Sequence, residues 1–128
     1  MHSRSAARAR SILAWMLGGL AIAGCRSSEK PPLPSGDYVF THKFAEHPSI
    51  PSIKLDVQIR GPHIVLTNND RTDVFPAGII NEGTLMWHAA SGQWIIGTEP
   101  AAAKATEVGG CSDGPEVVDL ERRIFWTC

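Results

Sequence analysis

Eight residues, 53–60 (IKLDVQIR), alternate between apolar and polar side chains without an exception. Successive side chains of a β-strand point to opposite faces, so this pattern predicts a strand with one face in an apolar core and the other in water. Gly61 and Pro62 then mark a turn, and residues 63–68 (HIVLTN) predict a partner strand. Together the two segments predict a hairpin.

The rest of the chain continues this β pattern. Residues 84–89 (TLMWHA) and 93–98 (QWIIGT) flank a short loop in which Gly92 can adopt a positive φ, and they predict a second hairpin. Residues 38–44 and 116–127 are further β-rich segments, whereas 100–107 (PAAAKATE) favour a helix of two turns at most. About seven short strands in one small domain predict an all-β fold, either an antiparallel barrel or a sandwich.

Charge is distributed unevenly along the 128 residues. The whole chain has 12 Lys and Arg against 13 Asp and Glu. Arg4, Arg8 and Arg10 lie in residues 1–24, which contain no acidic residue, so the remainder of the chain has a net charge of −4. An acidic body lacks the clustered cations that bind a phosphate backbone, so we expect no nucleic-acid partner.

The N-terminal segment has the layout of a secretory signal. Residues 1–10 are basic, and residues 11–23 (SILAWMLGGLAIA) carry no charge. A membrane-spanning helix needs about 20 apolar residues. This run is shorter and contains Gly18 and Gly19, so we interpret it as a signal peptide.

The end of this segment, residues 20–25 (LAIAGC), resembles the lipobox of bacterial lipoproteins, in which an aliphatic residue and two small residues precede a cysteine. In that family the cysteine thiol receives a diacylglycerol, and a signal peptidase cleaves immediately before the cysteine. Its new amino group is usually acylated as well. The resemblance implies that Cys25 is the lipidated first residue of the mature protein.

The same resemblance implies a location. Acyl chains contribute about 0.8 kcal/mol per buried CH₂, so two or more of them hold a protein on a bilayer. In the family, an Asp after the lipidated cysteine tends to retain the protein at the inner membrane of bacteria with two membranes. Arg26 stands there instead, which implies a lipid anchor in the outer membrane and a domain that faces the periplasm.

Residues 26–35 (RSSEKPPLPS) are polar and rich in proline, which predicts an extended, solvated tether. Ten extended residues reach at most ~35 Å, so the domain would stay near its membrane. The predicted organisation is a signal peptide over 1–24, a lipidated cysteine and tether over 25–35, and a β domain over 36–128.

Two cysteines remain once Cys25 is lipidated. Cys111 and Cys128 form an even pair in an exported chain, which predicts a disulfide that closes a loop of about 17 residues and contributes roughly 3 kcal/mol. Free thiols or an intermolecular bridge are the alternatives. Because the chain has neither a C-x-x-C nor an H-x-x-x-H motif, we expect no metal and no cofactor.

Few residues are candidates for chemistry. Residues 68–73 (NNDRTD) could offer oxygens to Ca²⁺, although their spacing is not that of an EF-hand and favours a plain solvated turn. Ser112 and Asp113 lie in a glycine-rich loop that lacks the G-x-S-x-G arrangement. The other candidates are His42, His47, His63 and His88, no two of which form an H-x-x-x-H motif. We expect His88, on the face opposite Trp87, at the surface.

Four aromatic residues, Tyr38, Trp87, Trp94 and Trp126, could line an apolar pocket or could form the core itself. The Gly36-Asp37-Tyr38 sequence resembles the G-x-W opening of lipocalins, which are eight-stranded ligand-binding barrels. That resemblance implies a carrier of a small apolar ligand.

These observations lead to one hypothesis and two alternatives. The hypothesis is a lipid-anchored envelope protein whose β domain is a non-catalytic binding or envelope-structural module, with an envelope protein as a possible partner. The first alternative is the lipocalin-like carrier. The second is a hydrolase that would use Asp113, Asp119 or His88, but these residues form no recognisable set of acid, base and nucleophile.

Overall fold

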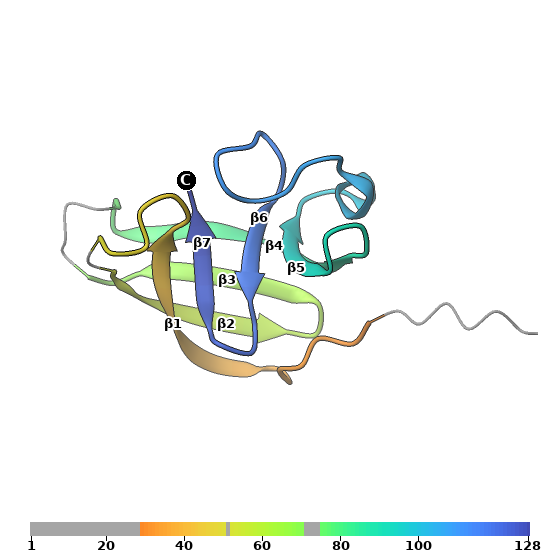
Figure 1. Ribbon diagram of the computed structural model, residues 1–128. Coiled ribbons are helices and arrows are strands. Elements are labelled where there is room, and N and C mark those ends of the chain that lie inside the picture. Colours follow the sequence, from red (N-terminus) through yellow and green to blue (C-terminus); the bar gives the residue numbers. More distant parts are fainter. Residues whose placement is uncertain (1–28, 51, 71–74) are drawn as a thin grey trace, which may run out of the picture.

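A computed structural model describes residues 29–50, 52–70 and 75–128, and within them the chain forms a closed β-barrel (Figure 1). The predicted all-β class is confirmed, and of the two architectures that the sequence left open, the barrel is correct. The described residues form seven strands and one short 3₁₀ helix. They are β1 (Gly36–Phe44), β2 (Lys54–Arg60), β3 (His63–Asn68), β4 (Gly78–His88), β5 (Gln93–Gly97), η1 (Pro100–Lys104), β6 (Glu116–Asp119) and β7 (Ile124–Thr127).

The strands follow one another around the barrel in chain order, and each pairs antiparallel with the next. The barrel closes where β7 pairs with β1, from Thr41 opposite Ile124 to Phe44 opposite Thr127. This last pair is parallel, because seven strands that alternate in direction leave the first and the last running the same way.

In β2, the apolar residues of the alternating pattern are buried and the polar residues are exposed. Leu55, Val57 and Ile59 are buried, whereas Lys54 and Gln58 are exposed. The buried residues join a core inside the barrel that also contains Phe40, Ile64, Leu66, Leu85, Ile96, Val118, Leu120 and Phe125. The interior is thus filled by side chains from every strand.

Both predicted hairpins are present. Residues 61–62 join β2 to β3, and the turn between β4 and β5 contains Gly92 with a φ of 66°. The β-rich segment 116–127 is divided into β6 and β7 by a tight turn, in which Arg123 has a φ of 57°.

A register shift separates the two halves of β4. Leu66 faces Asn81 but Thr67 faces Ile79, so Ile80 is an extra residue in β4. Ile80 packs against the core, and Ile79 is 61% exposed. Such a bulge reverses which residues of a strand face inward.

A second, smaller apolar cluster lies outside the barrel, where η1 packs against β4 and β5. Ile95, Ala102 and Val117 are its buried members. The contact requires glycine at position 97, because a Cβ there would come within 2.8 Å of both Ala102 Cβ and Met86 Sδ.

The structure brings Cys111 and Cys128 to disulfide distance, with 4.6 Å between their Cα atoms and a bond between their sulfurs. This spacing is usual for a disulfide. The bond attaches the end of β7, the strand that closes the barrel, to the loop before β6.

Candidate functional site

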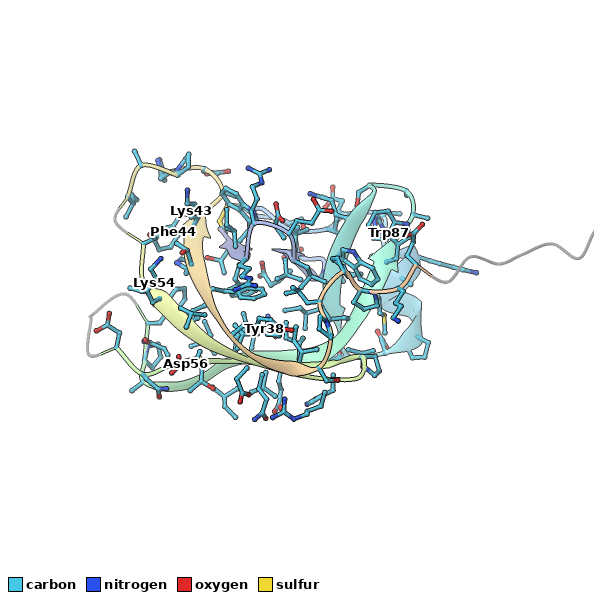
Figure 2. All side chains as sticks on the ribbon, turned by 90° about the horizontal axis from the view of Figure 1, so that it is seen from below. Tyr38, Lys43, Phe44, Lys54, Asp56 and Trp87 are labelled. Carbon is cyan, nitrogen blue, oxygen red and sulfur yellow. A yellow bond between two sulfur atoms is a disulfide. The ribbon has the colours of Figure 1, made fainter. Side chains whose placement is uncertain are left out.

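The two ends of the barrel differ in what lies on them. One end carries residues 29–35 and the turns that join β2 to β3, β4 to β5 and β6 to β7, and we call it the tether end. The far end carries the end of β1, the loop to β2 and Cys128. Figure 2 shows Trp87 at the tether end and Lys43 and Phe44 at the opposite end.

The segment before β1 is attached to the barrel. The sequence predicted a solvated tether, but Pro31 and Leu33 are half-buried, and Leu33 packs against the barrel core. Ser35 Oγ accepts a hydrogen bond of 2.8 Å from the backbone N–H of Gly61, and the Tyr38 hydroxyl donates one of 2.6 Å to the Pro34 carbonyl. The tether therefore docks on the barrel before the first strand begins.

Between this segment and the barrel lies a cleft of about 690 Å³. Its walls are mostly apolar and include Pro31, Leu33, Pro62, Leu85, Trp87 and Trp94. We call it the apolar cleft. Three segments that are distant in the sequence form it, namely residues 29–35, the β2–β3 turn and the β4–β5 hairpin, which is why no single motif revealed it.

Trp87 and Trp94 face each other across the β4–β5 hairpin and are both half-buried. Their ring centroids are 5.4 Å apart in an edge-on arrangement, which aromatic pairs favour. Leu85 and Ile96 lie two residues away on the same faces and belong to the core. The two indoles thus extend the core outward to the mouth of the barrel.

The other two aromatic candidates lie apart from this pair. Trp126 packs against the outer cluster under η1, although it borders, with Trp87 and Trp94, a neighbouring cleft of about 420 Å³. Tyr38 packs against the core, and the guanidinium of Arg123 lies 5.1 Å above its ring. Of the four, the structure places Trp87 and Trp94 in the apolar cleft.

The expectation that His88 lies at the surface is wrong: His88 is 2% exposed. Its Nε2–H donates a hydrogen bond of 2.6 Å to the Ala105 carbonyl, and Nδ1 bonds Ser91 Oγ at 2.7 Å. Since a carbonyl only accepts, Nε2 carries a proton, and the backbone N–H of Ser91 points at Nδ1 from 3.3 Å. His88 does lie on the face opposite Trp87, but the segment after η1 covers that face.

A second buried histidine, His42, lies toward the far end of the barrel. Its side chain is fully buried, with the rings of Phe44 and Phe75 each 4.6 Å away and nearly perpendicular to it. Nε2 shares a hydrogen bond of 2.8 Å with Thr127 Oγ1, and Nδ1 has no partner among the described residues. Burial lowers the pKa of His42 below its usual value.

Glu116 is another polar group that sequence analysis missed at this end. Its Oε2 is buried, without a hydrogen-bond partner in the described part of the chain, and burial raises the pKa of its carboxyl. It borders a shallow hollow of about 370 Å³ together with Phe44, Phe75 and Thr127.

The burial of His42 could have been predicted from the sequence. His42 lies two residues after Phe40 on the same face of β1, and side chains two residues apart in a strand point the same way.

The remaining candidates serve the loops that contain them. The carboxylate of Asp119 accepts hydrogen bonds from the backbone N–H groups of Glu121 and Arg122 and pairs with the Arg122 side chain at 3.0 Å. The Ser112 hydroxyl donates a hydrogen bond of 2.7 Å to the Gly109 carbonyl, and Asp113 is exposed.

The predicted calcium-binding or solvated turn lies only partly in the described residues. Asn68 is buried and donates to the Phe75 carbonyl at 3.0 Å, and its Oδ1 accepts from the Asp70 N–H. Residues 71–73 lie outside the described residues. His47 is exposed, and His63 Nε2 lies 3.7 Å from Glu82 Oε2. Across the described ranges, no three His, Cys, Asp or Glu side chains are grouped to hold a metal.

The predicted signal peptide, Cys25 and Arg26 lie outside the described residues. In the part that is described, no helix is long and apolar enough to cross a membrane. Comparison of the chain with protein families, curated proteins and solved structures gave no match.

Proposed function

We propose that this chain is a lipid-anchored bacterial envelope protein, attached through Cys25, whose barrel is a non-catalytic binding module. The sequence LAIAGC supports the anchor, and Arg26 supports the outer membrane, with the barrel in the periplasm. The observation that carries the binding role is the apolar cleft, because a recess of about 690 Å³ with mostly apolar walls and two tryptophans is suited to contact an apolar surface.

Two of the polar candidates, His88 and Asp119, are used in hydrogen bonds that hold loops, which supports a role without catalysis. Both ring nitrogens of His88 are engaged by Ser91 and Ala105, and the carboxylate of Asp119 holds the β6–β7 turn. A general base must have a free nitrogen or oxygen within reach of the proton that it abstracts. These two groups instead stabilise loops.

A carrier of a small apolar ligand is the second candidate, and the volume of the apolar cleft favours it. Such carriers hold their ligand inside the barrel. Here core side chains occupy the interior, so a ligand would bind at the tether end, between Leu33 and the two tryptophans.

Photocrosslinking in cells tests the binding role. A photoreactive residue at Ala89, which lines the apolar cleft, is compared with one at Glu46, an exposed residue of the far end. We expect adducts with a membrane-retained envelope component, protein or lipid, from Ala89 and not from Glu46. A small diffusible molecule on Ala89 would favour the carrier, and equal labelling at both positions would contradict a binding role for the cleft.

A further inference from the structure

We infer that the tether end of the barrel faces the membrane and that the apolar cleft contacts the surface of the bilayer. The inference rests on the proposed anchoring through Cys25 and names the partner of the same cleft. It follows from the length of chain between the anchor and the barrel, and from the side chains that this end exposes.

The docked tether shortens the distance between lipid and barrel. Glu29 lies at the rim of the apolar cleft, and only residues 26–28 separate it from Cys25. The stretch of chain from Cys25 to Glu29, four residues further on, spans at most ~14 Å when fully extended, compared with ~35 Å for a free ten-residue tether. The acyl chains of Cys25 would therefore enter the bilayer next to the tether end, and the far end would point away from it.

The side chains at the tether end suit the boundary between headgroups and acyl chains. Indole rings gather at this boundary because they combine a large apolar surface with one N–H donor. Trp87 and Trp94 are half-buried at the mouth of the barrel, beside Pro62 in the exposed β2–β3 turn. Partial burial of the two indoles leaves surface that lipid can cover.

Charge at this end is nearly balanced, so we do not expect the contact to need anionic lipid. Arg60 pairs with Asp37 at 3.3 Å, and Arg122 pairs with Asp119 at 3.0 Å. Of the other exposed charged residues at this end, Lys30 and Arg123 offset Glu29 and Glu121, and Arg26, next to the anchor, adds one positive charge. We therefore expect the orientation in vesicles of zwitterionic lipid, with little effect of salt.

Spin labels at the two ends test the orientation in full-length acylated protein reconstituted into phosphatidylcholine vesicles. One variant is Pro62→Cys at the tether end, and the matched variant is Ser49→Cys in the exposed far-end loop. Only the new thiols react, because Cys111 and Cys128 are bonded to each other and the Cys25 sulfur carries lipid in the proposed protein. We expect a several-fold higher ratio of oxygen to nickel-complex accessibility at position 62 than at position 49.

A second pair of variants tests whether the docked tether sets the orientation. Leu33→Ser removes the side chain that packs on the core, and Pro32→Ser changes its exposed neighbour. In Leu33→Ser the label at position 62 should lose its lipid exposure although the protein still floats with the vesicles. Pro32→Ser should retain it.

Protein that carries acyl chains and floats, but has equal accessibility at positions 62 and 49, overturns the orientation and leaves the anchoring intact. Lipid exposure that survives Leu33→Ser overturns the docked tether as its cause. Protein that has no acyl mass and stays in the aqueous fraction overturns the anchor and the orientation together.

Discussion

At the scale of single residues, the barrel interior accepts polar side chains where the strand period requires an inward residue. His42 follows Phe40 by two positions in β1 and is fully buried between the rings of Phe44 and Phe75. A histidine buried in this way is held neutral, because desolvation penalises the charged imidazolium. Stability should therefore depend on pH through this residue.

We expect the free energy of unfolding to fall as the pH decreases below 6.5, the ordinary pKa of histidine. In this window the unfolded chain binds a proton at His42 that the folded barrel does not, with a limiting slope of about 1.4 kcal/mol per pH unit. His42→Gln should reduce this slope, which urea titrations between pH 5 and pH 8 measure.

Glu116 acts in the opposite direction, since its raised pKa means that the folded state binds the extra proton. Glu116 is present in both proteins, so the difference in the pH slope of unfolding free energy between wild type and His42→Gln reports on the histidine alone. Identical slopes in the two proteins would show that His42 titrates alike in the folded and unfolded chains.

The two faces of β2 give a second prediction at this scale. Val57 is 2% exposed, and its neighbour Gln58 is exposed. Val57→Asp should cost several kcal/mol, because it forces an unpaired charge among apolar side chains, whereas Gln58→Asp should change stability by less than about 1 kcal/mol. Equal losses for the two variants in urea denaturation would contradict the inward face of this strand.

At the scale of elements, hairpins were predictable because local residues determine them. The alternation of residues 53–60, the Gly61-Pro62 turn and Gly92 each act within a few positions of the chain. The bulge at Ile80 and the packing of η1 on the barrel depend on contacts between distant segments. For the same reason, local patterns did not predict the burial of His88 or the position of Trp126 on the outer face.

The close packing of η1 on β5 predicts the effect of enlarging position 97. Gly97→Val should destabilise the barrel by about 1–3 kcal/mol, because the new side chain would overlap Ala102 and Met86. Thr98→Val, one residue later and exposed, is the matched control and should have little effect. Thermal unfolding of the two variants measures the difference, and a Gly97→Val protein as stable as wild type would show that η1 can move away at no cost.

At the scale of the whole molecule, closure depends on a strand of only four residues. β7 pairs with both β6 and β1, and the disulfide between Cys111 and Cys128 holds its end. The sequence predicted this pairing from cysteine number and compartment, since two cysteines remain after Cys25. The docking of the tether was not predictable, because Leu33 packs against core residues that are distant in the sequence.

Removal of the disulfide should therefore weaken the whole barrel. A variant with both Cys111→Ser and Cys128→Ser should lose roughly 3 kcal/mol of stability in the chain-entropy account of a 17-residue loop. Reduction of the wild-type protein should give a similar loss in denaturant titrations, and the double variant should not respond to reductant. Alkylation of both cysteines in unreduced, natively folded protein would show that the bond is absent.

We propose that Cys25 carries the lipid that holds the barrel on its membrane, and the intact mass of the membrane-extracted protein shows whether it does. We predict a chain without residues 1–24 that carries added acyl mass, and a Cys25→Ser variant that no longer fractionates with the membrane. A Cys25→Ser variant that still fractionates entirely with the membrane, or a wild-type protein without acyl mass, would contradict the claim.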